Sequence, residues 1–91
     1  MNLRKLARGQ PCTIRIPAVC NRDDSTTVGC HFRLPGLSGI GSKPHDLFIA
    51  HGCSACHAYV DSHSDAETQL AFAHGVFRTQ ARLVKAGAIK A

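Results

Sequence analysis

Two pairs of cysteines are the feature of this sequence that most restricts its fold. They stand at Cys12 and Cys20 and at Cys53 and Cys56 in a chain of 91 residues. A chain of this length buries too little apolar surface to be comfortably stable without a cross-link or a metal. It also has no Trp, one Tyr and four Phe with which to build a core. The sequence therefore predicts that the cysteines hold the fold together.

The beginning of the chain favours a metal over disulfides. Residues 1–5 lead into no apolar stretch of the kind found in a signal peptide, and no segment approaches the roughly 20 apolar residues that cross a membrane. We therefore expect a cytoplasmic protein, in a reducing compartment where clustered cysteines more often bind metal than pair. Four thiolates complete a tetrahedral shell around zinc. The Cys53-x-x-Cys56 spacing suits such a site, whereas the Cys12–Cys20 spacing is wider than usual, so disulfides, a redox dithiol and buried free thiols remain alternatives.

The fifth cysteine, Cys30, lies outside both pairs. Residues 28–34 alternate with the period of a half-buried strand, and Cys30 falls on the apolar face, where it would act as a small buried hydrophobe. The segment Cys53–His57 also fits the attachment motif of c-type haem. That alternative requires export and a second axial ligand, and it leaves Cys12 and Cys20 without a role.

The pattern along the chain predicts a small α+β fold. The strand at residues 28–34 carries His31 and Arg33 together on its polar face. A short apolar run at residues 46–50 predicts a second strand, which a glycine-bearing loop joins to the first. A short helix is expected at residues 57–63, directly after the second cysteine pair.

The last third of the chain predicts the longest helix, at about residues 65–86. Ser64 and Glu67 fit a capping box, in which each side chain satisfies a free backbone N–H. An apolar stripe at helical spacing follows, formed by Leu70, Ala73, Phe77, Ala81 and Val84. We expect this stripe to pack in the core rather than bind a partner, because so small a domain has little else to bury. The prediction is one domain over residues 1–91, with its core at about residues 12–63.

Three polar residues on these elements resemble the HNH endonuclease motif. His31 on the first strand, Asp46 at the start of the second and His57 in the following helix stand where that motif has His, then Asn or Asp, then His. The chain is more closely similar to the small prophage-encoded proteins of the YbcO type and to the related RecA-dependent Ref nucleases. The stretches that carry the resemblance are residues 3–12, 30–47, 50–57 and 78–82.

The resemblance implies a ββα-metal fold that hydrolyses DNA phosphodiester bonds with a divalent metal. His31 would be the general base that deprotonates the attacking water, a task that suits neutral imidazole at cellular pH. Asp46 would orient this base, and His57 would bind the catalytic Mg2+ or Mn2+. Asp61 lies four residues further along the same helix face and could supply an oxygen ligand, with His63 as its competitor.

The sequence departs from the HNH pattern at two positions. Many HNH sites carry an Asp or His just before the base as a further metal ligand, where this chain has Cys30. Asp46 replaces the usual Asn, which changes the local charge and could help to hold a metal or only cap a turn. The resemblance therefore leaves the full shell of the catalytic metal open.

Charge points to DNA as the partner. Eleven Lys and Arg against six Asp and Glu give a net charge of +5, which favours a polyanion through counterion release, or only a charged solvated surface. We expect backbone contacts that carry no sequence choice from Arg33, Lys43, Arg78 and Arg82. Lys43 follows the glycine-bearing loop, where backbone amides could approach a phosphate or the chain could only flex. The resemblance also implies a recombinase filament as a second partner.

The main alternative is a non-catalytic module, stabilised by zinc, that binds DNA or protein. Such a module would keep the scaffold and the basic surface but would not cleave. The sequence leaves open the form of DNA that is recognised and the oligomeric state, although a dimer would suit cleavage of both strands.

Overall fold

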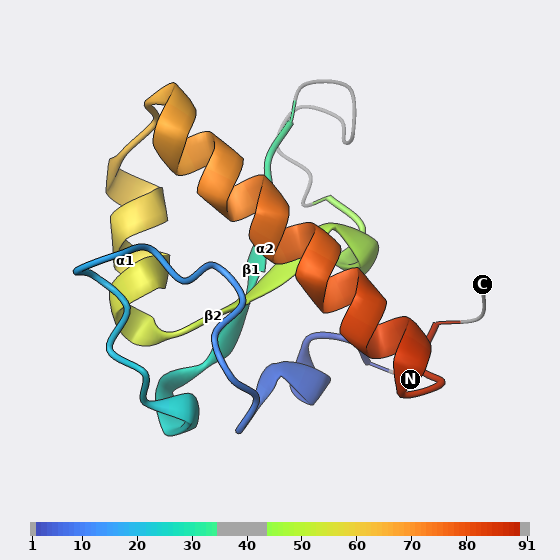
Figure 1. Ribbon diagram of the computed structural model, residues 1–91. Helices are drawn as coiled ribbons and strands as arrows, with labels where there is room; N and C mark the ends of the chain where they lie inside the picture. The colour runs from blue at the N-terminus through green and yellow to red at the C-terminus, as the bar shows by residue number, and fades with distance from the viewer. Residues whose placement is uncertain (1, 35–43, 90–91) are drawn as a thin grey trace.

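The computed structural model describes residues 2–34 and 44–89. Within them, a two-stranded sheet is crossed by a long helix and flanked by a shorter one (Figure 1). The elements follow in the order η1 (Lys5–Ala7), η2 (Asp24–Thr26), β1 (Val28–His31), η3 (Asp46–Phe48), β2 (Ile49–Gly52), α1 (Ser54–Ser62) and α2 (Ala66–Lys85), where η marks a 3-10 turn. This is the small α+β fold that the sequence predicts.

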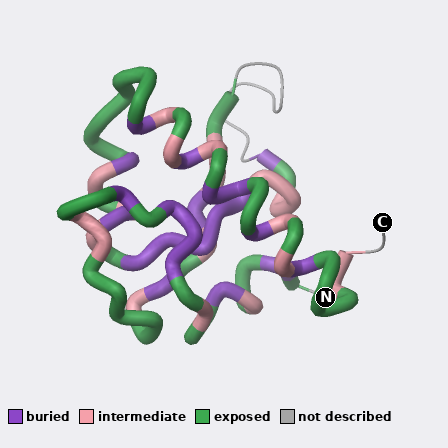
Figure 2. Tube along the Cα trace, viewed as in Figure 1, coloured by how far each residue is buried: buried purple, intermediate pink, exposed green. Residues whose placement is uncertain are grey.

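The strands pair antiparallel in a register that faces Cys30 with Ala50 and His31 with Ile49. All four residues of β2 are buried, because α2 lies against this strand. The centre of the molecule is therefore the sheet and the segments around it, while the outer surfaces of the helices are exposed (Figure 2). Cys30 is buried, as the sequence predicts.

Both strands differ from the predicted ranges. The first ends at His31 rather than at residue 34, and Leu34 is 52% exposed. The strand pairing ends at His31 because Ile49, the first residue of β2, lies opposite it. The second strand begins at Ile49 rather than at residue 46, since residues 46–48 form the turn η3. His45 caps this turn, accepting the Leu47 amide proton at its Nδ1 atom over 3.0 Å.

The helix starts also differ from the predicted ones. α1 begins at Ser54, three residues before the predicted start, because the Cys53 sulfur accepts the Cys56 amide proton and caps the helix. α2 is capped by Asp65, whose carboxylate accepts the Thr68 amide proton at 3.0 Å. The predicted capping box led by Ser64 is therefore wrong. No helix in the described part of the chain is long and apolar enough to cross a lipid bilayer.

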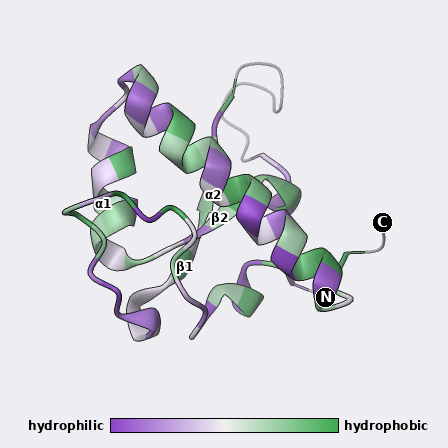
Figure 3. Cartoon of the chain, viewed as in Figure 1, coloured by the Kyte–Doolittle hydropathy of each residue, from purple (hydrophilic) through white to green (hydrophobic). Residues whose placement is uncertain are grey.

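The prediction that the apolar stripe forms the buried face of α2 is wrong. Phe77 is 64% exposed, and Figure 3 shows hydrophobic and hydrophilic residues mixed along the outward surface of α2. The buried residues of this helix are Thr68, Phe72, Gly75, Val76, Thr79 and Leu83. This face is turned to the sheet because it contains small and hydroxyl-bearing residues, which allow the helix to come close. A Cβ added at Gly75 would stand 3.1 Å from the Cα atom of Ile14.

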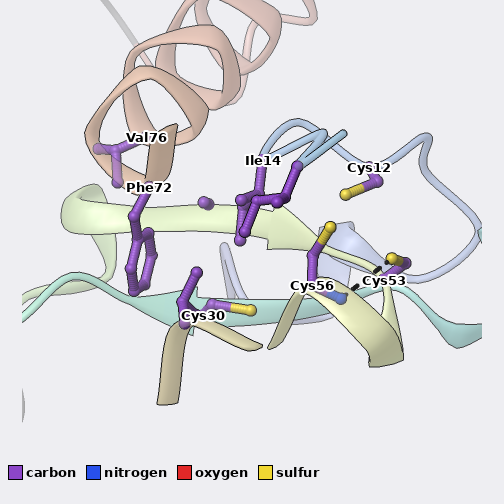
Figure 4. Packing of buried hydrophobic residues seen from close by; sticks show 10 residues of the cluster. Cys12, Ile14, Cys30, Cys53, Cys56, Phe72 and Val76 are labelled. Carbon is purple, nitrogen blue, oxygen red and sulfur yellow. Dashed lines mark hydrogen bonds between the residues drawn. The ribbon is translucent and has the colours of Figure 1, made fainter. Parts of the chain in front are cut away.

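The core is built around Ile14, which lies between α2 and the sheet (Figure 4). The edge of the Phe32 ring packs on the Phe72 ring, with centroids 5.0 Å apart. The buried residues of this cluster are Cys12, Ile14, Ile16, Cys30, Ala50, Cys53, Cys56, Val60, Phe72 and Val76. Cys12, Cys53 and Cys56 thus belong to the buried core, and the partly buried Cys20 packs against it. The chemistry of these cysteines is therefore part of the fold's stability.

Gly52 is expected to tolerate no side chain. A Cβ at this position would lie 2.8 Å from both the Cys30 Sγ atom and the Ile14 Cδ1 atom, so the Gly52→Ala variant must displace buried atoms. Overpacking of this kind costs about 1–3 kcal/mol, which lowers the melting temperature of a domain this size by roughly 5–20 °C. Thermal unfolding followed by circular dichroism measures the shift.

Gly29 on the facing strand provides the matched control. A Cβ there would meet Ile49 Cδ1 at 3.4 Å, an ordinary contact. Gly29→Ala should therefore melt within a few degrees of the wild type. Equal melting temperatures for the two variants would contradict the close packing at Gly52.

Candidate functional site

The two cysteine pairs meet at one end of the core. Cys12 and Cys20 come from the loop before η2, whereas Cys53 caps α1 and Cys56 lies in its first turn. Their four sulfur atoms all lie within 4.8 Å of one another. Figure 4 shows the sulfur atoms of Cys12, Cys53 and Cys56 gathered at this end, with Cys30 apart on β1. The grouping predicted from the sequence is confirmed, and it excludes Cys30.

The spacing of the sulfur atoms fits a metal better than disulfides. The Cys20 and Cys53 sulfurs are 3.9 Å apart, whereas a disulfide requires about 2.05 Å. Thiolates bound to zinc at about 2.3 Å stand about 3.8 Å apart in a tetrahedron. The donor set therefore fits a closed structural zinc site. A zinc site also gives a role to Cys12 and Cys20, which have none in the haem alternative.

The protonation of these thiols depends on their surroundings. Burial raises the pKa of the Cys56 thiol and of the Cys20 thiol. Burial also acts to raise the pKa of Cys53, but backbone N–H groups of Cys56 and Asn21 donate to its sulfur and bring the pKa down to about 7. Only a cation between them would stabilise all four groups as thiolates at once.

Buried hydrogen bonds tie the first cysteine loop to the sheet and to α2. The Thr13 amide donates to the His51 carbonyl, and the His51 amide donates to the Oγ1 atoms of Thr13 and Thr79, at 3.0 Å each. The Thr79 hydroxyl in turn donates to the Gly75 carbonyl. Because these groups are buried, each unmade bond would cost about 1–3 kcal/mol. The network therefore fixes the loop that carries Cys12.

Arg78 and Arg82 hold the same loop from outside. An N–H of Arg78 donates to the Thr13 carbonyl at 2.8 Å, and an N–H of Arg82 donates to the Pro11 carbonyl at 2.9 Å. The Arg82 guanidinium also lies 2.9 Å from Nδ1 of the buried His51. Burial, helped by the Arg82 charge, lowers the pKa of His51 to about 4, so this imidazole is neutral. The sequence predicted that these two arginines contact DNA; in the fold they bind the first cysteine loop.

A second polar cluster joins His31 to Asp46. The turn η3 ends where β2 begins opposite His31, and it brings the Asp46 Oδ1 atom within 2.8 Å of His31 Nε2. Arg4 approaches the other carboxylate oxygen at 3.3 Å. The hydrogen bond from His31 is the main cause that lowers the pKa of Asp46, and the Arg4 charge adds to it. The sequence predicted the His31–Asp46 pair but not Arg4.

His31 is less accessible than its place on the predicted polar face implies. Its side chain is only 12% exposed, because Asp46 and the surrounding segments cover it. It still lines a pocket of about 300 Å³, together with Arg33, Val60, Asp61, Gln69 and Phe72. The pocket joins one end of β1 to α1 and α2. It therefore places a histidine, an arginine and a carboxylate around one space.

His57 and Asp61 form a pair on α1. Their Nε2 and Oδ2 atoms are 3.3 Å apart, and the side chains are 41% and 68% exposed. Among the residues that the structure describes, no third Cys, His, Asp or Glu side chain completes a metal site with them. His63, the predicted competitor, instead stacks on the Tyr59 ring with centroids 3.8 Å apart. The pair therefore offers one nitrogen and one oxygen, both open to solvent.

The remaining predicted DNA contacts are Arg33 and Lys43. Arg33 is exposed at the rim of the His31 pocket, where it could reach a phosphate. Lys43 and the glycine-bearing loop lie outside the described residues. No periodicity or spacing links Arg4 to Asp46, so only the folded chain reveals that contact.

Known proteins share both the sequence and the fold. Residues 1–88 match the family described as "Putative nuclease YbcO". Relatives with that description in Escherichia coli (strain K12) and Enterobacteria phage 82 are each 47% identical over 94 residues, covering 99% of this chain and 98% of the relative. A solved structure described as "Structure of a putative bacteriophage protein from Escherichia coli str. K-12 substr. MG1655" gives a TM-score of 0.77 at 38% identity, over 94% of this chain and 100% of that one. The chain therefore belongs to the "Putative nuclease YbcO" family.

Proposed function

We propose that this chain is a metal-dependent DNA endonuclease of the HNH type. The observation that carries the proposal is the pocket that His31 shares with Asp61, with Asp46 bound to His31 and His57 beside Asp61. The element order β1, β2, α1 supports it, because a ββα-metal site places its base on a strand and its metal ligand on the following helix. The relatives' description as nucleases points in the same direction.

The His31–Asp46 pair suits general-base catalysis. Asp46 accepts a hydrogen bond from Nε2, so the proton of the neutral imidazole belongs on that nitrogen. Nδ1 then keeps its lone pair and can take a proton from water. The carboxylate holds the ring in one orientation and stabilises the imidazolium that forms after proton transfer. Asp46 thereby does the orienting work expected of the middle residue of the motif.

His57 and Asp61 are the proposed ligands of Mg2+ or Mn2+. A histidine nitrogen and a carboxylate oxygen are ordinary ligands for such ions, and their exposure leaves room for water and phosphate oxygens. When bound, the ion would neutralise charge that develops on the phosphate and on the leaving oxygen. Arg33 at the pocket rim would hold the DNA backbone, as would Lys43 and the N–H groups of Arg78 and Arg82 that the first cysteine loop does not use.

The four cysteines have a separate, structural role in this proposal. They would bind zinc with no open position, which fixes the start of α1, the helix that carries His57 and Asp61. Cytoplasmic location belongs to the same proposal, because a reducing compartment keeps the thiols free to bind metal. Action on recombinase-coated DNA belongs to it through the resemblance to the RecA-dependent Ref nucleases.

Cleavage assays on purified protein test the proposal. We expect zinc-loaded protein to cut DNA when Mg2+ or Mn2+ is added and to be inactive without either ion. His57→Ala should lower cleavage at least 100-fold at low metal and recover in part in excess Mn2+, because the variant weakens metal binding. Single-stranded, duplex, branched and recombinase-coated DNA serve as the substrates.

His74, an exposed residue on α2 with no proposed role, supplies the control His74→Ala, which should cleave at the wild-type rate. Folded, zinc-loaded protein that binds DNA but cuts none of the four substrates with either ion would favour the non-catalytic binding module.

A further inference from the structure

A basic pocket lies at η1 and shares one residue, Arg4, with the His31–Asp46 cluster described above. Its volume is about 360 Å³. The residues that line it are Asn2, Arg4, Lys5, Arg8, Thr27, Val28 and Gly29. Three of these carry a positive charge and none carries a negative one. The charge of the lining therefore suits an anion, and neither the HNH resemblance nor the relatives assign a ligand to this pocket.

The fold holds this pocket in place. Ala7 is fully buried and Leu3 nearly so, and together they anchor η1 against the sheet, while Lys5 and Arg8 are exposed. Gly29 forms part of the pocket wall, and a Cβ there would stand 3.5 Å from the Arg4 Cα atom. The positive side chains thus project from a short turn that packs directly on β1.

Arg4 connects the pocket to the proposed base. Its Nε atom lies 3.3 Å from Asp46 Oδ2, and Asp46 Oδ1 lies 2.8 Å from His31 Nε2. The Arg4 side chain, which is 48% exposed, thus makes an ion pair with Asp46 and also lines the pocket. An anion that contacts Arg4 in the pocket would therefore be separated from the His31–Asp46 pair only by the Arg4 side chain.

We propose that this pocket binds a backbone phosphate of the DNA strand that the His31 site acts on. The inference rests on the proposed function, and it names a contact that would set the position of the strand. Phosphate contacts from Lys and Arg supply most non-specific DNA affinity and fix the register of the bound duplex. The ion pair with Asp46 restrains Arg4, so binding a phosphate should cost this side chain less conformational freedom than it would cost an unpaired surface arginine.

The test compares two double variants that remove the same charge. Lys5→Gln/Arg8→Gln empties the pocket of two cations, whereas Arg22→Gln/Lys85→Gln removes two exposed cations elsewhere. Affinity for a fluorescent duplex is measured by anisotropy over a salt series, with zinc-loaded protein and no added Mg2+ or Mn2+. For the pocket variant we expect a slope of log K against log salt that is shallower by about 1–2, and for the control an unchanged slope.

Further measurements make the outcome specific. The charge-preserving variant Lys5→Arg/Arg8→Lys should restore the wild-type slope, and circular dichroism should show the same melting temperature for all variants. Equal slopes for the pocket variant and its control would overturn the phosphate site, even if the wild type cleaves DNA. Conversely, a wild type that never cleaves but shows the expected slope change would keep the phosphate site and remove the proposed nuclease activity.

Discussion

Cys53→Ser should leave most of the protein unfolded at 25 °C and without stoichiometric zinc. The Cys53 sulfur belongs to the four-cysteine group and also caps α1. A serine hydroxyl can still cap the helix, so the effect of this substitution comes from the lost zinc ligand. Structural zinc contributes about 10–16 kcal/mol to folding in zinc-finger peptides at pH 7, comparable to the 5–15 kcal/mol that stabilises a typical domain. Elemental analysis for zinc and far-ultraviolet circular dichroism measure the two effects, with about one zinc per wild-type chain expected.

Cys30→Ala is the matched control, since Cys30 is equally buried but lies outside the group. Burial raises the pKa of its thiol to about 12, so it remains a neutral core side chain. Losing one sulfur atom from the core should cost about 1 kcal/mol and leave zinc content unchanged. If both variants kept their zinc and melted alike, the four-cysteine site would not be what holds this fold.

His31→Ala should reduce DNA cleavage by about 10²–10⁴-fold, the usual contribution of a general base. Excess Mn2+ should not rescue it, because the variant lacks the base rather than a metal ligand. DNA affinity and zinc content should stay near the wild-type values. Because His31 is largely buried and bound to Asp46, we also expect a loss of about 1–2 kcal/mol in the free energy of unfolding. Single-turnover cleavage and thermal melting separate these effects.

Asp46 provides the variants that distinguish catalysis from structure. Asp46→Asn keeps an oxygen that can accept the hydrogen bond from His31 Nε2 and introduces the residue usual in HNH sites, so it should retain much of the activity. Asp46→Ala removes the group that orients the His31 ring, so this variant should lose most of the cleavage activity. The HNH mechanism would be wrong for this protein if folded His31→Ala cleaved at the wild-type rate.

Which side chains of the site lie together was predictable, because this grouping depends on residue type and order. Spacing and compartment were enough to group Cys12 and Cys20 with Cys53 and Cys56, and the sulfur atoms do lie together. The HNH resemblance likewise predicted that Asp46 serves His31, and the two side chains are hydrogen-bonded. Errors of two or three residues in the predicted limits of the strands do not change which of these side chains meet.

The element limits and the helix face were not predictable in the same way. The start of a helix depends on which local side chain accepts the free backbone N–H groups of the first turn. In α2 this side chain is Asp65 and not its neighbour Ser64. The buried face of α2 depends on close approach at Gly75 and hydrogen bonds at Thr79, which a hydrophobic pattern does not register. The contact of Arg4 with Asp46 spans most of the first half of the chain, so it follows only from the fold.

The four-cysteine group also determines where the chain can change in length. Its two pairs come from segments 33 residues apart, and the entropy of closing such a loop grows only with the logarithm of its length. Doubling the connection would cost only about 0.6 kcal/mol, provided the same ends still meet. A single residue inserted between Cys53 and Cys56 would instead rotate one sulfur around the helix and out of reach of the other three. Length variation should therefore collect in the long connection, in its loops outside β1 and β2, while the short spacing stays constant.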